Sequence, residues 1–317
     1  MLRSNALLAV MFVLAACGQP SANTGDTVVS ELSQFEHLPG FFDLYWDVRA
    51  GRLIIEVDEL EEQFMYQSSM ARGVGSNDIG LDRGQLGSTR VVWFQRSGPK
   101  LLLIEDNLDY RAASDNPDEQ AAVDESFATA VIWGFEIIGE RDGAVYIDAT
   151  DFLIRDSHAV SARLARMEEG NFTPDASRSA IYMPMTKSFP DNSEMEAIVT
   201  FTGQATGRYL SDVTPDWQVI SVHLHHSFIR LPDDEYEPLP LDPRSGFFGR
   251  TFQDYASEVG EPLRVSFAAR HRLEKQDPSA GISEAVEPIV YYVDRGAPEP
   301  IRTALIEGAE WWNQAFE

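Results

Sequence analysis

The sequence has 317 residues, of which 44% are hydrophobic and 24% are charged. This composition is typical of a globular protein with one large domain or two smaller ones. Asp and Glu total 51 against 25 Lys and Arg, for a formal net charge of -26 at pH 7. Because such a surface repels phosphate backbones and anionic lipid headgroups, we expect no nucleic acid partner and no electrostatic attraction to a membrane.

Residues 1–16 have the pattern of a lipoprotein signal peptide. Arg3 is followed by an apolar run from Ala6 to Ala16, which is too short to cross a bilayer as a helix. The run ends in Leu-Ala-Ala-Cys and resembles the bacterial lipobox, in which the cysteine is acylated and becomes the new N-terminus. We therefore predict that Cys17, the single cysteine of the sequence, attaches the protein to a membrane through lipid.

The predicted lipid anchor also indicates where the protein resides. Residues 17–39 are expected to contain the lipidated cysteine and a flexible polar tether. Gly18 follows the cysteine, whereas Asp at that position is associated with retention at the inner membrane. The predicted location is therefore the cell envelope of a bacterium, as a secreted lipoprotein on the outer-membrane or periplasmic side.

Residues 40–275 carry mostly strand and turn signals. Apolar and polar side chains alternate from Phe42 to Asp47, which is the period of a half-buried strand. Two hairpins are predicted around turn clusters, one at Ser97-Gly98-Pro99 and one at Arg141-Asp142-Gly143. Further strands are expected at Ala180–Met185, Glu196–Thr202, Gln218–Leu231 and Leu263–Arg272, and helices at Glu119–Ala130 and Ser157–Met167.

Many strands, few helices and short connections favour the α+β class. The regular strand-helix alternation of a parallel sheet is missing. We therefore predict a β-rich, mostly antiparallel ancillary domain over residues 40–275, followed by a linker over residues 276–287.

The glycine-rich segment Arg72–Arg90 has two interpretations. It contains no lysine that would suit a phosphate-binding loop, but Asn77, Asp78 and Asp82 offer oxygen ligands for a hard cation such as calcium. The alternative is an ordered surface loop with tight turns, and the sequence favours it. Metal binding by this segment stays open at this stage.

The stretch VHLHHSF is a second candidate. On a strand, His223 and His225 share one face and His226 points to the other. Two histidines at this spacing ligate zinc if a third ligand comes from elsewhere, but half-buried imidazoles bonded to neighbouring strands are the commoner arrangement. The sequence contains no Gly-x-Ser-x-Gly elbow, no phosphate loop ending in Gly-Lys-Ser/Thr and no His-Glu-x-x-His motif. We therefore assign no catalytic residue, cofactor-binding residue or metal ligand.

Residues 288–317 have a different pattern. Pro288–Val293 is predicted as a short strand, and a helix is predicted from Ile301. Its apolar positions keep helical spacing up to Trp312 and Phe316, so the helix presents a face that normally packs on a sheet. That sheet must come from the upstream domain or from residues beyond this sequence. We expect the latter, which makes the chain an N-terminal fragment.

Several stretches resemble the N-terminal half of large secreted bacterial zinc-dependent metalloproteases, a half made of domains of unknown function. These stretches occur in order over nearly all of residues 40–317. They are GFFDLYWDVRAGRLIIEV, GSNDIGLDRGQLGSTRVV, IDATDFLIRDSHAV, DASRSAIYMPMTKSFPDNSEMEA, HHSFIRLPDD, ARHRLEKQDP and EPIVYYVDRGAPEPIRTALIEGAEWWNQAFE. The resemblance implies that residues 288–317 are the first strand and helix of a truncated metzincin-like catalytic domain.

The resemblance also implies a function. The full-length enzyme would be a zinc-dependent endopeptidase acting on a protein or peptide substrate, with its zinc ligands downstream of this chain. We expect the 317-residue chain to be inactive by itself. The alternative from a different class is a non-enzymatic envelope lipoprotein that acts as a binding or interaction module.

Overall fold

The computed structural model describes residues 29–316, which form two compact units, each assembled from two stretches of the chain. Unit 1 contains residues up to Asp106 together with Thr129–Leu231, and unit 2 contains Asn107–Ala128 together with the residues from Pro232 onward. The predicted ancillary domain over residues 40–275 therefore contributes to both units. The sequence-based boundaries at 275 and 287 stay a prediction.

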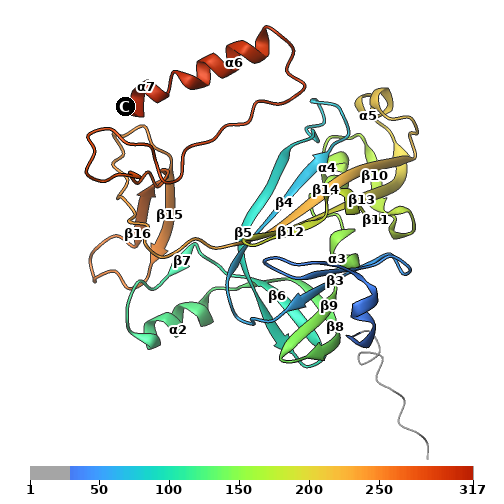
Figure 1. Ribbon diagram of the computed structural model, residues 1–317, viewed down its shortest axis with the longest axis horizontal. Helices are drawn as coiled ribbons and strands as arrows, with labels where there is room; N and C mark the ends of the chain where they lie inside the picture. The colour runs from blue at the N-terminus through green and yellow to red at the C-terminus, as the bar shows by residue number, and fades with distance from the viewer. Residues whose placement is uncertain (1–28, 317) are drawn as a thin grey trace, which may run out of the picture. The chain divides into compact units, whose positions relative to one another are not determined.

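Unit 1 is a single curled sheet that forms a half-barrel (Figure 1). The strand order is β1-β2-β3-β9-β8-β6-β5-β4-β14-β13-β10, with β11 and β12 also paired to β13, and every pairing in unit 1 is antiparallel. The predicted β-rich, mostly antiparallel architecture is confirmed. The strands are β1 (Glu36–Leu38), β2 (Leu44–Asp47), β3 (Arg52–Val57), β4 (Phe64–Arg72), β5 (Gln85–Ser97), β6 (Lys100–Glu105), β8 (Ala130–Arg141), β9 (Ala144–Asp148), β10 (Gly170–Pro174), β11 (Ala180–Ile181), β12 (Lys187–Phe189), β13 (Asn192–Ala205) and β14 (Val219–Arg230).

The short helices of unit 1 lie in the connections between strands. Helices α3 and α4 follow β9, and α5 follows β13 (Figure 1). The predicted helix at Ser157–Met167 begins later than expected, because Asp156 accepts hydrogen bonds from the amides of Val160 and Ser161 and so starts α4 there. The bounds are η1 (Leu32–Gln34), α3 (Thr150–Leu153), α4 (Val160–Arg166), η2 (Ala176–Arg178), η3 (Met183–Met185) and α5 (Arg208–Val213).

Both predicted hairpins are present, and their turns follow from local chemistry. Asp142 and Gly143 connect β8 to β9 with φ of 53° and 94°. Two consecutive positive φ values define the type I′ turn that Asp-Gly favours. Gly98, with φ of 59°, begins the turn between β5 and β6. The turn residues therefore set these hairpins without help from distant contacts.

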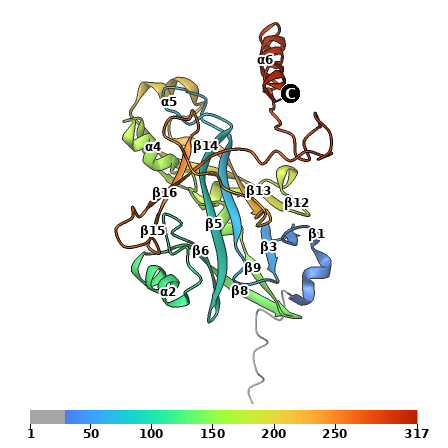
Figure 2. The ribbon, with the colours of Figure 1, turned by 90° about the vertical axis from the view of Figure 1, so that its left-hand side faces the viewer.

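The ends of the sheet meet near β2. The amide of Phe41 donates to the carbonyl of Phe189 at 2.7 Å, and the amide of Phe42 donates to Oγ of Ser193 at 2.9 Å. These bonds join the residues before β2 to β12 and β13, which lie at the other end of the strand order. The sheet therefore curls around an interior, as Figure 2 also shows.

That interior is packed with aromatic rings. Phe64 contacts the rings of Phe42, Phe94 and Phe228 with centroids 5.0 to 5.4 Å apart. Tilted and edge-to-face pairs at such distances add about 0.5–1.5 kcal/mol each beyond the area they bury. A second, smaller cluster around Tyr45 and Tyr146 covers the opposite face of β2, β3 and β9. Strand β2 is therefore buried on both faces, whereas the alternating sequence pattern predicted one exposed face.

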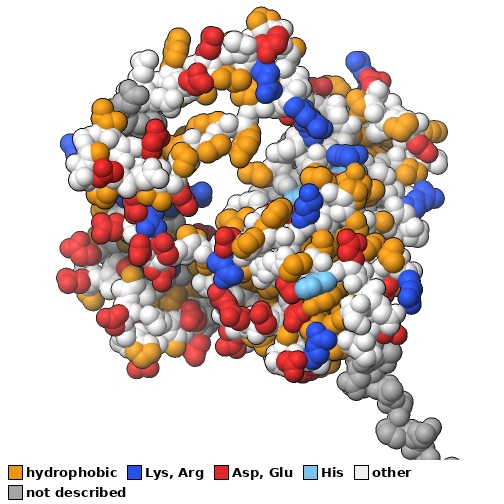
Figure 3. Space-filling view, in the orientation of Figure 1, with side chains coloured by type: hydrophobic (Ala, Val, Ile, Leu, Met, Phe, Trp, Pro, Cys, Tyr) orange, Lys and Arg blue, Asp and Glu red, His pale blue; other side chains and the backbone are white. Residues whose placement is uncertain are grey.

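Unit 2 contains a three-stranded sheet in the order β16-β15-β7, in which β15 and β7 are parallel. Its elements are β7 (Tyr110–Arg111), α2 (Pro117–Ser126), β15 (Gly249–Asp254), β16 (Arg264–Ala268), α6 (Ile301–Glu310) and α7 (Asn313–Phe316). Helix α2 ends earlier than the predicted Ala130, and its exposed acidic side chains are part of the acidic surface seen over this unit in Figure 3.

The C-terminal segment agrees with the sequence prediction in one element and contradicts it in another. A helix begins at Ile301 as expected. The prediction of a strand at Pro288–Val293 is wrong for the described residues, because this segment pairs with no strand there. A strand needs a neighbouring edge to satisfy its backbone hydrogen bonds, and no strand of residues 29–316 offers one to this segment.

Candidate functional site

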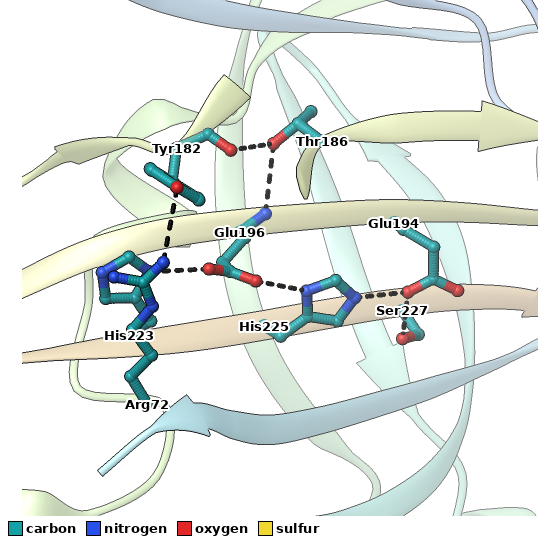
Figure 4. A network of polar contacts seen from close by, with 8 residues as sticks. All are labelled: Arg72, Tyr182, Thr186, Glu194, Glu196, His223, His225 and Ser227. Atoms are coloured by element: carbon teal, nitrogen blue, oxygen red, sulfur yellow. Dashed lines mark hydrogen bonds and ion pairs between the residues drawn. The ribbon is translucent and has the colours of Figure 1, made fainter. Parts of the chain in front are cut away.

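The candidate site is a cluster of ionisable side chains on β13 and β14, shown in Figure 4. Glu194 and Glu196 lie two residues apart on β13, and His223 and His225 lie two residues apart on β14. Glu196 stands directly opposite His225 in the antiparallel register. Residues two apart on a strand share a face, so the register brings all four side chains together. We call these four residues the His-Glu network.

Three contacts connect the His-Glu network. Nδ1 of His223 lies 2.6 Å from one carboxylate oxygen of Glu196, and Nδ1 of His225 lies 3.2 Å from the other. Nε2 of His225 lies 2.6 Å from a carboxylate oxygen of Glu194. Both ring nitrogens of His225 therefore face carboxylates. Carboxylates only accept hydrogen bonds, so both nitrogens must carry protons and His225 is an imidazolium.

The electrostatics agree with this assignment. Burial alone would lower the pKa of His225, but the hydrogen bonds to Glu194 and Glu196 outweigh burial and raise it to about 9. Burial alone would likewise raise the pKa of both glutamates. The hydrogen bonds from His225 outweigh that effect and hold the pKa of Glu194 and Glu196 below the usual range.

A cover over the network comes from Tyr182 and Thr186, which flank η3, and from Arg72 at the end of β4. The Tyr182 ring packs edge-on against His223 with centroids 4.8 Å apart, and the Arg72 guanidinium lies 5.4 Å from the Tyr182 ring centroid. Oγ1 of Thr186 accepts the Glu196 amide at 3.2 Å and donates to the Tyr182 carbonyl. Glu196 is therefore 3% exposed despite its charge. Figure 4 shows Tyr182 and Thr186 on one side of β13 and Arg72 on the other.

The third histidine of the stretch points the other way, as predicted. His226 is fully buried beneath Tyr66 and Phe152. Its Nε2 donates to the carbonyl of Leu153 at 3.2 Å, so Nδ1 is unprotonated and accepts the Tyr66 hydroxyl at 2.9 Å. Burial, together with the charge of Arg155, lowers the pKa of His226 well below its usual range, and the ring is neutral.

The histidines do not form a zinc site with the residues around them. Both nitrogens of His225 are engaged by carboxylates, which leaves that ring no lone pair for a metal. Between residues 29 and 316, no group of three or more His, Cys, Asp or Glu side chains is placed to hold a metal ion. The part of the chain that the structure describes therefore does not fit a catalytic zinc, and no hydrolytic step is assigned to it.

Within the segment Arg72–Arg90, residues 73–84 form an ordered loop that connects β4 to β5. Val74, Ile79 and Leu81 insert into the core, and the Val74 amide donates to the Leu81 carbonyl at 2.9 Å. The carbonyl of Ile79 accepts Nε of Arg163 from α4. Asn77 and Asp78 are exposed and Asp82 is half-buried. Among residues 29–316, Asp78 and Asp82 belong to no group of three or more His, Cys, Asp or Glu side chains that could hold a metal ion.

The predicted lipid site Cys17 lies outside the described residues. Among the helices of residues 29–316, none has the length and apolar character needed to cross a membrane.

Sequence inspection missed the two glutamates of the network. The two-residue spacing of Glu194 and Glu196 matches that of His223 and His225, but the predicted strand began at Glu196 and left Glu194 outside it. The register of β13 and β14 was needed to show that the two pairs face each other.

Comparison with known proteins places the chain in a family. A family model described as a domain of unknown function, DUF5117, matches residues 84–276. This match spans more than half of the chain, and the chain belongs to this family. No curated protein and no solved structure gave a significant match.

Proposed function

We propose that this chain is the N-terminal, non-catalytic region of a lipid-anchored cell-envelope zinc metalloendopeptidase. The half-barrel would be an ancillary domain that supports the catalytic domain or positions a protein substrate. The zinc ligands would lie downstream of Glu317. Lipid on Cys17 would hold the protein at the envelope membrane.

The observation that carries this proposal is the exposure of the apolar side chains on and directly after helix α6. Ile301, Leu305 and Ile306 are 55%, 52% and 37% exposed. Trp311 and Trp312, directly after the helix, are 74% and 65% exposed. Burying a large apolar side chain is worth about 1.5–3 kcal/mol, so an amphipathic helix normally covers such a face. The face is unused among the described residues, which suits a helix that packs within a larger catalytic domain.

The resemblance of residues 288–317 to the start of a metzincin-like domain supports the same proposal. The extended segment at Pro288–Val293 carries strand-forming residues without a strand partner in the described chain, including Tyr291 and Tyr292 at 76% and 93% exposed. A catalytic domain would supply both a sheet edge for this segment and a core for α6.

The test compares the 317-residue chain with the complete product of its gene. We expect the gene to encode a His-Glu-x-x-His motif after Glu317 and the complete protein to cleave a denatured protein in a chelator-sensitive way. The 317-residue chain should show no cleavage. Chelator-sensitive cleavage by the 317-residue chain would contradict the proposal. A reading frame without the motif would contradict the proposal and favour the alternative function, a non-enzymatic lipoprotein.

The membrane anchor has a separate test. Metabolic labelling with a radioactive fatty acid should mark the protein. On cell fractionation, the labelled protein should be recovered with the envelope membranes. A Cys17→Ser variant should lose both the label and the membrane association. If the Cys17→Ser variant is still labelled, Cys17 is not the site of lipid attachment.

A further inference from the structure

Arg155 is a half-buried arginine that makes no ion pair with a carboxylate in the described chain. It lies in the connection of residues 154–159 between α3 and α4, which we call the Arg155 connection. Nη1 donates to the Phe152 carbonyl at 2.6 Å, and Nη2 donates to the Tyr66 hydroxyl at 3.0 Å. A guanidinium has five N–H donors, so three of them have no acceptor among residues 29–316.

Aromatic rings surround the guanidinium. Its central carbon lies 3.8 Å from the ring centroid of Phe152 and 5.8 Å from those of Tyr66 and Trp133. Cation–π attraction offsets part of the cost of removing the charge from water. Aromatic rings cannot accept the in-plane N–H donors, so the hydrogen-bonding capacity of Arg155 remains available.

The charged groups near Arg155 do not neutralise it. Arg90, whose charge acts against that of Arg155, is paired with Glu105 at 3.1 Å. Asp156 directs its two oxygens to the amides of Val160 and Ser161 at 2.7 and 2.9 Å. His226 is neutral. Among residues 29–316, therefore, no carboxylate pairs with the Arg155 guanidinium.

Polar atoms without partners gather around the same connection. Six buried side-chain polar atoms of the described residues have no hydrogen-bond partner, and four of them belong to Ser68, Ser157, His158 and Ser161. Three of these four residues lie in or next to the Arg155 connection. The fourth, Ser68, is 1% exposed and lies two residues from Tyr66 on the same face of β4.

Two of these atoms lie beside the backbone of Gly87. The Ser68 hydroxyl and Nδ1 of His158 lie 2.4 and 3.5 Å from where a Cβ of Gly87 would stand. Buried polar groups are rarely left unpaired in folded proteins, and their concentration at one place calls for a common explanation. A bound polar molecule would account for the free donors of Arg155 and for these atoms together.

We propose that the Arg155 connection, with Tyr66 and Ser68 of β4, binds a carboxylate group. The two oxygens of a carboxylate fit the planar guanidinium, which has donors free to bind both of them. Glu105 and Asp156 oppose any anion, and they oppose phosphate, which carries between one and two charges at neutral pH, more strongly than a singly charged carboxylate. The carboxylate belongs either to a free small molecule or to the C-terminus of a peptide. This inference is independent of the proposed function.

Isothermal titration of the 317-residue protein tests the site with four probes. They are propionate, inorganic phosphate, N-acetyl-Ala-Phe with a free carboxylate, and the same dipeptide as its C-terminal amide. We expect saturable binding of the free-acid dipeptide and weaker binding of phosphate, with no binding of the amide. Propionate binding would indicate that a small carboxylate suffices, whereas binding of the free-acid dipeptide alone would assign the site to a peptide C-terminus.

Two variants localise the binding. Arg155→Met should weaken binding of the free-acid dipeptide by about tenfold or more, since a charge-assisted hydrogen-bond pair is lost. Arg96→Met is the matched control, because it makes the same change at an exposed arginine already paired with Glu140. Its affinity should equal that of the unaltered protein.

Three outcomes overturn the proposal. They are equal affinity for the amide and the free acid, undiminished affinity in a folded Arg155→Met variant, and no saturable binding of either carboxylate probe. In the last case the unpaired atoms are hydrated by buried water instead. If Arg155→Met does not fold, the comparison of free acid and amide on the unaltered protein decides the question.

Discussion

Strand β14 buries a histidine on each of its faces, and the two neighbouring rings are in opposite charge states. His225 lies between two carboxylates and is an imidazolium, whereas His226 lies between a hydroxyl and a carbonyl and is neutral. Burial disfavours the charged form of both rings. Burial is the main reason that His226 is neutral, whereas the two carboxylates outweigh burial at His225 and make that ring charged.

The two faces also differ in what a substitution would disturb. On the inner face, His226 packs with Tyr66 and Phe152 inside the aromatic core. On the outer face, His225 joins two charges under a thin cover beside η3. Loss of the inner ring should therefore cost stability through packing and hydrogen bonds together, and loss of an outer partner should cost it through charge.

The largest effect is expected from His226→Ala. The substitution leaves a cavity in the core and removes the partners of the Tyr66 hydroxyl and the Leu153 carbonyl, so the free energy of unfolding should fall by about 4 kcal/mol. Urea denaturation at pH 7.5 measures it. His37→Ala is the control, because His37 is an exposed histidine that also contacts a tyrosine ring. Equal losses for the two variants would contradict the packing argument.

A smaller loss is expected from Glu196→Gln on the outer face. This change leaves His225 with one carboxylate instead of two, and the free energy of unfolding should fall by about 2–3 kcal/mol. The same urea experiment measures it, with Glu136→Gln at an exposed position of β8 as control. In a double-mutant cycle with His225→Gln, purely additive losses would show that the two side chains are not coupled.

The pH dependence of stability should separate the two faces. The pKa of His225 is raised to about 9, so its stabilisation is complete below about 6.5 and is lost as pH rises through about 9. His226 has a lowered pKa, so its neutral form contributes stability above about 6.5, and this is lost as pH falls below that value. Glu194 and Glu196, with lowered pKa, add a loss below about 4.5.

Melting temperatures recorded from pH 5 to pH 10 would test this. The unaltered protein should be most stable near pH 6.5, and its stability should decline as pH rises from about 6.5 to about 9 and also as pH falls below about 6.5. A His225→Gln variant should lose most of the decline on the alkaline side and keep the decline on the acidic side. If its alkaline decline matches that of the unaltered protein, the imidazolium assignment is wrong.

The smallest effect is expected from Thr186→Val in the cover. Valine keeps the shape but removes the hydroxyl that accepts the Glu196 amide and donates to Tyr182, so the free energy of unfolding should fall by about 1 kcal/mol. Thr173→Val, at an exposed position of β10, is the matched substitution. A Thr186→Val protein as stable as the Thr173→Val protein would show that the cover adds no stability.

Local features of the fold were predictable from the sequence, and distant pairings were not. The Asp142-Gly143 turn follows from the two residues themselves, because few other pairs adopt positive φ in succession. The pairing of β4 with β14 joins segments about 160 residues apart, and the sequence of neither strand predicts which strand it pairs with. The Pro288–Val293 prediction failed because strand-forming residues do not make a strand without a neighbouring edge.

In the candidate site, too, local features were predictable from the sequence and distant contacts were not. The two-residue period of a strand was enough to place His223 and His225 on one face and His226 on the other. The sequence by itself therefore determined which histidines act together, along with the β-rich class, the hairpin turns and the apolar face of α6. Only the tertiary structure decided that Glu194 and Glu196 meet the outer pair and that Tyr66 and Leu153 meet His226. It also decided that Arg155 pairs with no carboxylate of residues 29–316. Those outcomes depend on strand register and on contacts between segments far apart in sequence, and the charge state of each group follows from the partner it meets.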